Sequence, residues 1–328
     1  MNGPSPLLSV RDLKVHFKLA SESPWPWEPA RVLKAVDGVS FDIFPGETLG
    51  IVGESGCGKS TLARAILNLI PPTSGSIVWQ GQELCGAGAG AWQAVRKDVQ
   101  MIFQDPLASL DPRMTIGQII AEPLRTHFPK MGNIEVMKKV RAMMAKVGLT
   151  EQQINRYPHE FSGGQCQRIG IARALILEPK LVICDEPVSA LDVSIQAQII
   201  NLLQELQATM GLALVFIAHD LAVVRHISQR VMVMYLGRAV ELAAKQAIYQ
   251  NPGHPYTQAL LSAIPLPDPR TERNKVVQLL VGDLPSPINP PSGCSFRTRC
   301  PKAEAGCAQQ TPQLRALSPE TQVACLLA

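Results

Sequence analysis

Long apolar runs are missing from this sequence. No stretch of its 328 residues approaches the ~18–20 consecutive apolar side chains that a membrane-spanning helix needs. The apolar run at 212–218 is too short and predicts a buried strand. The first residues also lack a charged region followed by an apolar one, so they predict no signal peptide. We therefore expect a cytoplasmic protein that serves a membrane, if at all, by docking on other subunits.

A concentration of one charge is missing as well. The formal net charge is only +4, and no long run of Lys and Arg occurs. Proteins that bind nucleic acid usually gather far more basic charge on one face. We expect no nucleic-acid partner.

Cysteines are present, but a cytoplasmic location argues against disulfides. Four of the eight are scattered along the chain, and four lie close together in the last 35 residues or so, with the spacing C-x5-C-x6-C-x17-C: Cys294, Cys300, Cys307 and Cys325. Four thiolates suit Zn²⁺ or an iron–sulfur cluster, although the spacing is not that of paired CxxC ligands. Free buried thiols are the third interpretation, and spacing alone leaves all three open.

The order of the predicted elements is that of an α/β protein. Alternating patterns predict strands at 7–19 and 32–44, with a surface loop rich in Pro and Trp at 21–30. Segment 105–160 carries helical periodicity and little strand signal, so we interpret it as an inserted helical subdomain. A later helix is capped by Ser194 and ended by Gly211 in this prediction.

Two domains follow from this pattern. We predict an α/β domain over 1–250, with its helical subdomain at about 105–165. Beyond residue 250, Pro and Gly become frequent, which predicts a separate extension at 251–328 with little regular structure. Such a segment needs a staple or a partner surface to stay ordered.

The first motif with clear chemistry is a P-loop of the form GxxxxGK[ST]. Its glycines let backbone N–H groups surround phosphate oxygens, and the following helix points its positive end at the same phosphates. Lys59 is predicted to reach the β- and γ-phosphates, and Ser60 to place its hydroxyl on Mg²⁺. The predicted ATP-binding residues of this loop are Gly53, Glu54, Ser55, Gly56, Cys57, Gly58, Lys59, Ser60 and Thr61.

Two acids end the apolar run LVIC at 181–184. Ligands of open α/β sheets bind at the carboxyl ends of strands, so Asp185 is predicted to hold Mg²⁺ and Glu186 to take a proton from the attacking water. Two acids after a strand are usually ordinary surface charges. The presence of a P-loop in the same chain favours the catalytic interpretation of Asp185 and Glu186.

A second glycine-rich helix start follows Phe161: Ser162, Gly163, Gly164 and Gln165. The SGGQ segment is predicted to form another anion site at a helix N-terminus, and two such sites in one chain indicate a composite site. Here the chain resembles the nucleotide-binding subunits of ABC transporters, whose signature is LSGGQ. Phe161 replaces the usual Leu, at a position that packs rather than contacts phosphate.

That resemblance implies further site residues. Gln104 is similar to the Q-loop residue, which senses Mg²⁺ and water, and Ser189–Asp192 to the D-loop, with Asp192 at the subunit interface. His219 matches the switch histidine of the γ-phosphate, and Phe17 the aromatic residue that stacks on adenine. The implied fold is a P-loop NTPase core with an antiparallel β subdomain, an inserted helical subdomain and a cysteine-containing C-terminal extension.

The segments 251–263 and 282–301 resemble the C-terminal extension of oligopeptide and dipeptide uptake ATPases, and 101–126 and 156–198 resemble the F-type ATPase subunits of oligopeptide permeases especially closely. The resemblance implies an ATPase of an oligopeptide importer, working with ATP and Mg²⁺ at the cytoplasmic face of the inner membrane. Its implied partners are a related second ATPase subunit in a heterodimer, two membrane permease subunits and, indirectly, a peptide-binding protein.

In this subfamily the four C-terminal cysteines are associated with a [4Fe–4S] cluster. Zinc and no metal stay open as alternatives. Dipeptides, nickel and glutathione stay open as substrates. A soluble ABC ATPase of translation or DNA repair usually carries tandem cassettes or a coiled-coil insertion, and this chain has neither. A P-loop kinase is a second alternative, but the SGGQ and SALD segments have no role in a kinase.

Overall fold

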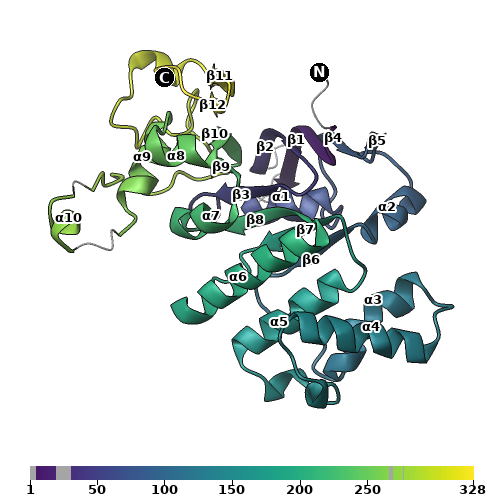
Figure 1. Cartoon of the computed structure of the whole chain (residues 1–328). Helices are drawn as coiled ribbons and strands as arrows, with labels where there is room; N and C mark the ends of the chain where they lie inside the picture. Colours follow the sequence, from purple (N-terminus) through teal and green to yellow (C-terminus); the bar gives the residue numbers. More distant parts are fainter. Residues whose placement is uncertain (1–4, 20–30, 266–268, 276) are drawn as a thin grey trace, which may run out of the picture. The chain divides into compact units, whose positions relative to one another are not determined.

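The computed structural model describes residues 5–19, 31–265, 269–275 and 277–328 (Figure 1). The predicted surface loop at 21–30 lies outside these residues. The chain divides into two compact units, and each is described by itself. We call them the P-loop unit, which contains 6–42, 49–85 and 219–328, and the signature unit, which contains mainly 43–48 and 86–218.

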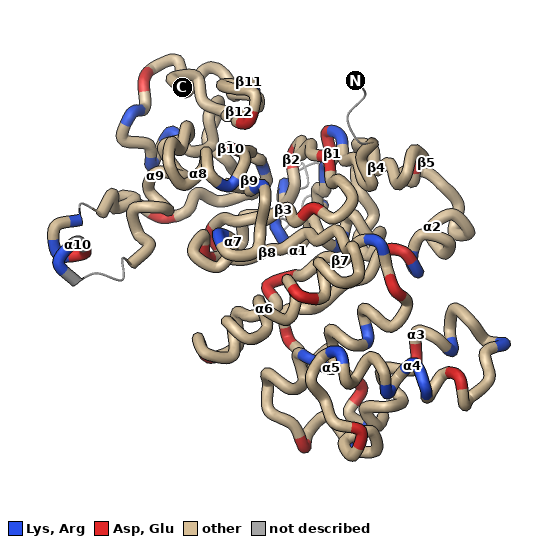
Figure 2. Tube along the Cα trace, viewed as in Figure 1, with Lys and Arg blue, Asp and Glu red and all other residues tan. Residues whose placement is uncertain are grey.

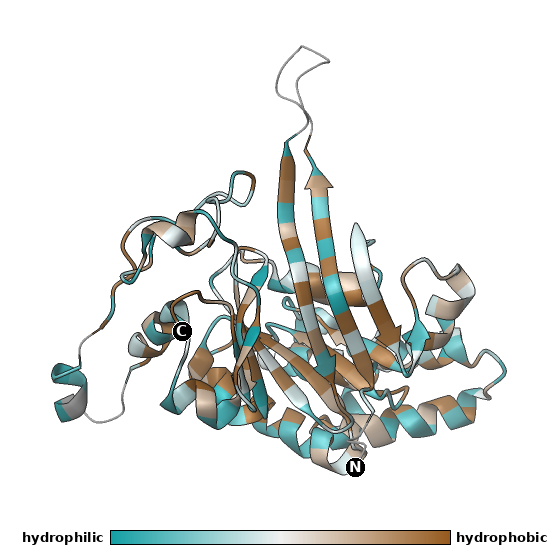
Figure 3. Ribbon diagram, turned by 90° about the horizontal axis from the view of Figure 1, so that it is seen from above, coloured by the Kyte–Doolittle hydropathy of each residue, from teal (hydrophilic) through white to brown (hydrophobic). Residues whose placement is uncertain are grey.

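The P-loop unit holds two sheets. The first has the strand order β2-β1-β4-β5, with β1–β4 and β4–β5 antiparallel. Its strands are β1 (Leu8–Lys18), β2 (Val32–Ile43), β4 (Ser74–Trp79) and β5 (Gln82–Glu83). Buried residues alternate with less buried ones along much of β1 and over the second half of β2, the two long strands that flank residues 20–30 in Figure 3. This alternation is the pattern of a sheet with one face in the core.

The other strands of this unit run in the order β11-β12-β10-β9-β3. The pair β3–β9 is parallel, and the remaining neighbours are antiparallel. These strands are β3 (Thr48–Val52), β9 (Arg230–Tyr235), β10 (Arg238–Ala244), β11 (Arg315–Ser318) and β12 (Thr321–Val323). Residues from the C-terminal extension thus add two strands beside β10, although the sequence predicted little regular structure there.

The helices of the P-loop unit are short. They are α1 (Lys59–Ile66), α7 (Leu221–Ile227), α8 (Lys245–Gln250), α9 (Pro255–Ser262), α10 (Pro269–Arg273) and the 3₁₀ turn η3 (Ala305–Ala308). Helix α1 follows β3 directly after the predicted P-loop, so this strand–loop–helix prediction is confirmed.

The signature unit carries three parallel strands in the order β8-β7-β6. They are β6 (Val99–Ile102), β7 (Leu181–Asp185) and β8 (Ala213–Ala218), and every residue of β7 and β8 is buried. Continuous apolar strands of this kind are typical of parallel sheets covered on both faces.

Helices make up the rest of the signature unit. They are α2 (Ala89–Arg96), α3 (Ile116–His127), α4 (Asn133–Lys146), α5 (Gly163–Leu175), α6 (Val193–Met210) and the 3₁₀ turns η1 (Glu151–Gln153) and η2 (Pro158–Glu160). Helices α3, α4 and α5 pack on one another (Figure 1). The described residues from 105 to 165 contain no strand, as the helical periodicity predicts, while the limits of the predicted domains stay a prediction.

Helix α6 corrects one detail. Asp192, not Ser194, is its N-cap, and Ser194 lies inside the first turn. The C-terminal prediction is confirmed, because Gly211 takes the left-handed conformation that ends a helix. Ser and Asp have similar capping propensities, so propensity alone does not separate Ser194 from Asp192, which stands two residues earlier.

Two bulk properties bear on function. Along the described part of the chain, Lys and Arg are interspersed with Asp and Glu rather than gathered in a long basic run (Figure 2). None of the described helices combines the length and the hydropathy that crossing a bilayer requires.

Candidate nucleotide-binding site

The P-loop is folded around glycines that cannot carry a side chain. Gly58 has φ +103°, and a Cβ there would lie 2.0 Å from the carbonyl oxygen of Ala35. A Cβ on Gly53 would lie 2.2 Å from the carbonyl oxygen of Met234. Both glycines are therefore required by a close approach of other backbone, which fixes the shape of the loop.

The N-terminus of α1 has no side-chain cap. Its N-cap is Gly58, which forms no side-chain capping hydrogen bond. The backbone N–H groups and the dipole at the start of a helix together favour an anion at this end. The position matches the phosphate site that the sequence predicts.

Lys59 is almost completely buried at the start of this helix, with 3% of its surface exposed. Its Nζ donates to the carbonyl oxygens of Gly53 (2.8 Å) and Glu54 (3.2 Å). A buried ammonium needs such partners, and these carbonyls hold it within the loop that is predicted to bind phosphate.

The other loop residues divide by exposure. Ser55 and Gly56 are exposed, while Ser60 and Thr61 are half-buried. Cys57 packs beneath the loop with 1% exposure, and burial raises the pKa of its thiol. Cys57 therefore fills space as a neutral group, and its role in the site is that of its backbone.

The signature unit brings two predicted residues together. Gln104 donates from Nε2 to Oε2 of Glu186 at 3.1 Å. Glu186 takes a positive φ of 46°, with its N–H bonded to the carbonyl oxygen of Ile217, and Ser189 Oγ donates to its carbonyl oxygen at 3.0 Å. This backbone conformation is uncommon in a non-glycine residue, and these hydrogen bonds stabilise it. They thereby fix the position of Glu186 directly after the end of β7.

Asp185 precedes it as the last residue of β7 and is 1% exposed. Asp192 is exposed at the start of α6, where it serves as N-cap. The predicted switch residue His219 is exposed directly after β8, and Phe17 is half-buried on β1. The assigned roles of these four residues stay predictions.

The signature segment begins α5 with a reciprocal capping box. Ser162 Oγ accepts from the N–H of Gln165 at 3.4 Å, and Gln165 Oε1 accepts from the N–H of Ser162 at 3.1 Å. Ser162 and Gly163 are exposed, Gly164 is half-buried against Ile195, and Phe161 is half-buried before the cap. The segment therefore presents a helix N-terminus on the surface of its own unit.

The four C-terminal cysteines gather in one part of the extension. The N–H of Cys294 donates to the carbonyl oxygen of Cys307 at 2.8 Å. The pKa of the Cys294 thiol is raised, mainly by burial and further by the thiols of Cys307, Cys300 and Cys325. Yet no three His, Cys, Asp or Glu side chains among the described residues are arranged to hold a metal ion. The expected [4Fe–4S] cluster and zinc therefore have no preformed site among the described side chains.

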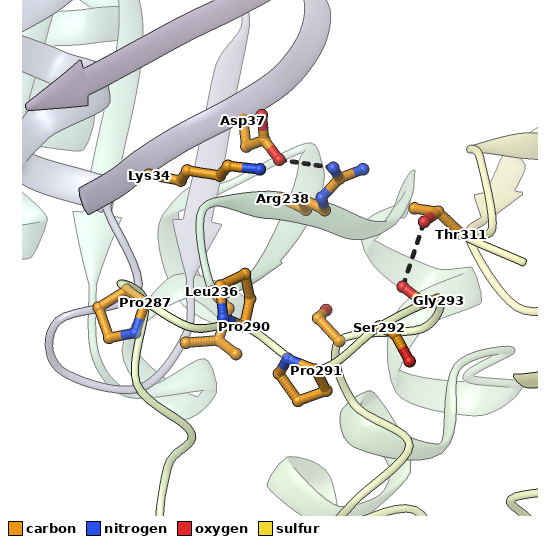
Figure 4. Close-up of a pocket in the computed structure, with 11 residues that line it drawn as sticks. Lys34, Asp37, Leu236, Arg238, Pro287, Pro290, Pro291, Ser292, Gly293 and Thr311 are labelled. Carbon is orange, nitrogen blue, oxygen red and sulfur yellow. Dashed lines mark hydrogen bonds and ion pairs between the residues drawn. The ribbon is translucent and has the colours of Figure 1, made fainter. Parts of the chain in front are cut away.

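A separate cavity of about 240 Å³ lies where the extension meets β2 and the β9–β10 turn (Figure 4). Arg238 pairs with Asp37 at 2.5 Å, and although burial works to raise the pKa of Asp37, the charge of Arg238, with His16 and Lys34, lowers it. The two cationic side chains of the cavity, Arg238 and Lys34, thus already interact with the carboxylate of Asp37. Its other wall is formed by the extension: Pro287, Pro290, Pro291, Ser292, Gly293 and Thr311.

Comparison with known proteins decides the family. The model of the family "ABC transporter" matches residues 36–189, and "Oligopeptide/dipeptide transporter, C-terminal region" matches 240–307. The chain is 68% identical over 308 residues to the oligopeptide transport ATP-binding protein OppF of Escherichia coli (strain K12), covering 94% of this chain and 92% of that protein. The chain belongs to the ATP-binding proteins of peptide ABC transporters. The sequence-based assignment to this family is confirmed.

Other relatives agree. OppF of Haemophilus influenzae (strain ATCC 51907 / DSM 11121 / KW20 / Rd) is 62% identical over 320 residues, covering 98% of this chain and 96% of that protein. A solved dimeric structure of the ATP-binding cassette MJ0796 bound to ADP and Pi matches with a TM-score of 0.64 and 27% identity, over 73% of this chain and 98% of that one. The predicted P-loop NTPase fold of the ABC type is thereby confirmed.

Two residues that contact the P-loop were missed in the sequence. Tyr256 and Arg299 both bind Glu54, from 202 and 245 positions further along the chain. Tyr256 lies in the NPGHPY segment and Arg299 beside Cys300, both of which the sequence marked only as parts of the extension. No local pattern indicates a contact over such a separation.

Proposed function

We propose that this chain is the ATP-binding and ATP-hydrolysing subunit that energises an importer of oligopeptides. The observation that carries the proposal is the buried Lys59 in a glycine loop at an uncapped helix N-terminus, in a chain 68% identical to an oligopeptide transport ATP-binding protein.

ATP binding is assigned to the P-loop. The backbone N–H groups from Gly53 to Thr61 bind the phosphates, Lys59 leaves its carbonyl partners for the β- and γ-phosphates, and Phe17 stacks on adenine. Ser60, Gln104 and Asp185 offer hard oxygen donors of the kind that Mg²⁺ prefers. Bound Mg²⁺ would neutralise charge on the phosphates at these residues.

Hydrolysis is assigned to Glu186 as general base. The hydrogen bond from Gln104 orients its carboxylate, which takes the proton from the water that attacks the γ-phosphate. His219 stabilises the charge that develops on the γ-phosphate. Positioning and charge neutralisation thus supply most of the catalysis, as is general for phosphoryl transfer.

The signature segment and Asp192 are assigned to a second subunit's nucleotide. A related but distinct ATPase chain is the proposed partner, so that each chain's SGGQ segment closes over ATP held by the other. Closure at the cytoplasmic face of the inner membrane moves two membrane permease subunits. A peptide-binding protein delivers the peptide to these subunits. ATP binding energy thereby shifts the transporter between two conformations.

Reconstitution tests the proposal. The chain, its partner ATPase and the two membrane subunits are placed in vesicles, and ATP-dependent uptake of a labelled oligopeptide is measured. Competition by dipeptide, nickel or glutathione then reports which substrate class the importer prefers. A chain that hydrolyses ATP but never copurifies with membrane subunits would instead be a soluble ABC ATPase.

We also propose that the four C-terminal cysteines take up an iron–sulfur cluster in the cell. The support is the resemblance of this segment to the peptide-uptake ATPases and the grouping of the thiols of Cys294, Cys300, Cys307 and Cys325. Burial raises the pKa of Cys294 and of Cys300, and the neighbouring thiols add to that rise. Iron, sulfide and zinc are measured on protein purified without oxygen. About four irons and four sulfides per chain, lost in Cys294→Ser, support the cluster. One zinc, or no metal, refutes it and leaves the ATPase assignment unchanged.

A further inference from the structure

Glu54, the second residue of the P-loop, is bound through all three of its polar groups. Its N–H donates to the Tyr256 hydroxyl at 3.0 Å, and its carbonyl oxygen accepts from Lys59 Nζ at 3.2 Å. Its carboxylate receives Arg299 Nη1, at 3.0 Å from Oε1 and 2.9 Å from Oε2. A single residue therefore connects the lysine that is assigned to phosphate with two side chains of the C-terminal extension.

Arg299 is held where it meets Glu54. Only 9% of its side chain is exposed, against 26% for Glu54. Burial by itself lowers the pKa of Arg299, but Glu54, and after it Tyr235, outweigh this and raise the pKa. A charge-assisted contact of this burial is stronger than a surface ion pair.

An aromatic cluster supports both contacts. The rings of Tyr235 and Tyr256 lie 4.8 Å apart, and Phe296 lies 5.2 Å from the first and 5.4 Å from the second. All three side chains are essentially buried. Phe296 also accepts, through its carbonyl oxygen, the N–H of Arg299, so this cluster fixes the backbone from which Arg299 extends.

Tyr256 is placed by a second set of bonds. The buried carboxylate of Glu241 accepts the N–H groups of Gly253 (2.7 Å) and His254 (3.0 Å), and His254 Nδ1 accepts the N–H of Tyr256 at 3.0 Å. These bonds begin α9 with Tyr256 in its first turn. These bonds, together with its burial, fix the position of the Tyr256 hydroxyl that accepts the Glu54 N–H.

The charge of Glu54 gives this arrangement a consequence for ATP. A free carboxylate in a loop that binds a polyphosphate repels its ligand, because like charges at a few ångströms disfavour each other. Pairing with Arg299 cancels that charge and holds the Glu54 backbone, to which Lys59 is bound. Arg299 thus acts on the nucleotide through Glu54.

We propose that Arg299 is a positioning residue of the P-loop, which couples the cysteine-bearing segment 294–307 to ATP affinity. The inference rests on the proposed ATPase function and adds a support that the motif does not contain. Because it leaves Glu186 untouched, it concerns ATP binding and not the chemical step.

The test measures the dissociation constant for MgATP on the full chain, and KM and kcat on the assembled transporter. Arg299→Gln is expected to weaken MgATP binding about tenfold, equal to ~1.4 kcal/mol, and to raise KM while kcat stays near wild type. Arg299→Lys keeps the charge and recovers part of the loss. Arg297→Gln is the matched control, since Arg297 lies in the same segment but its guanidinium donates to Ser292 and not to Glu54.

The double variant Glu54→Gln/Arg299→Gln separates pairing from folding. It removes both charges, so its affinity is expected to return to within about threefold of wild type. An Arg299→Gln protein that binds MgATP like wild type, or a double variant no better than the single one, overturns the inference. Lys59→Ala is expected to abolish MgATP binding. If the wild-type protein also shows no MgATP binding, the proposed ATPase function fails, rather than the inference on Arg299.

Discussion

Two helices of this chain begin at segments assigned to phosphate, and they are built differently. Helix α1 starts at Gly58, in a left-handed conformation and without a side-chain cap. Helix α5 starts at Ser162, which forms a complete capping box with Gln165. The first has no side-chain cap, whereas the second satisfies part of its own N-terminus through the pair Ser162 and Gln165.

Their supports differ in range as well. The P-loop packs closely against the backbone of Ala35 and Met234 and is bound by Tyr256 and Arg299, all distant in sequence. The signature segment rests on its own box and on Leu191 and Ile195, about thirty residues away. We infer that the P-loop depends on the whole of its unit for its shape, while the signature segment is locally stable and waits for a partner's nucleotide.

The largest effect is expected outside both helix starts. Glu186→Gln removes the proposed base, so turnover by the assembled transporter falls by ~10²–10⁴-fold while MgATP binding is retained. Single-turnover hydrolysis and nucleotide binding are measured on the same preparation. Glu205→Gln, on the exposed side of α6, is the control. Normal hydrolysis in Glu186→Gln would refute the general-base role and leave the contrast between the helices intact.

The contrast itself is sharpened by two glycine substitutions. Gly58→Ala forces a Cβ against the Ala35 carbonyl at a φ of +103°, so it costs ~3 kcal/mol of unfolding free energy and most of the MgATP affinity. Gly163→Ala stays within about 1 kcal/mol of wild type, because the nearest atom to its Cβ is Leu191 Cδ2 at 3.5 Å. Urea unfolding compares the two, and equal losses would contradict the difference in build.

Acid should weaken the support of the P-loop but not that of the signature segment. Burial lowers the pKa of His254 from 6.5 to about 4, so the unfolded chain binds a proton first as pH falls. The loss of unfolding free energy that His254 causes is absent above about pH 7.5, grows as the pH drops through 6.5, and levels off below about pH 4. It reaches ~2 kcal/mol of lost stability at pH 5.

His254→Asn tests this contribution, since an Asn side chain also caps a helix but does not titrate. Urea unfolding at pH 8 and pH 5 is compared between variant and wild type. The variant is expected to lose less stability over this range. An identical loss in both proteins would remove His254 from the account.

The smallest effect belongs to the signature cap. Ser162→Ala costs ~1 kcal/mol of stability, as does Thr115→Ala, which breaks a similar box on α3. Only Ser162→Ala should lower hydrolysis by the assembled pair of ATPases, since only that helix faces a nucleotide in the proposed mechanism. Equal activity of the two variants would mean that the signature segment acts through stability alone.

Much of the site follows from local sequence. Strand β3, the P-loop and α1 fall where the motif predicts them, because glycine spacing and a buried strand specify their own geometry. The contact of Gln104 with Glu186 also follows, since parallel strands deliver their carboxyl ends to one edge.

Other features depend on pairings that no local pattern contains. Strand β12 pairs with β10, and β11 pairs with β12, which no local pattern in the extension indicates. Arg299 reaches Glu54 across 245 positions. A lone histidine such as His254 gives no sequence signal, and its role as helix cap emerges only from its burial and its bond to the Tyr256 N–H.

Hydrogen exchange of the dilute chain, with and without MgATP, tests the central contrast most directly. Amides 53–61 should be protected by nucleotide, and those of 294–307 should follow through Arg299, because coupling between sites is reciprocal. Amides 162–165 should exchange at the same rate with and without MgATP until the partner subunit is added. Protection of 162–165 in the isolated chain, with 53–61 unchanged, would contradict the assignment of ATP to the P-loop and of the signature segment to a partner.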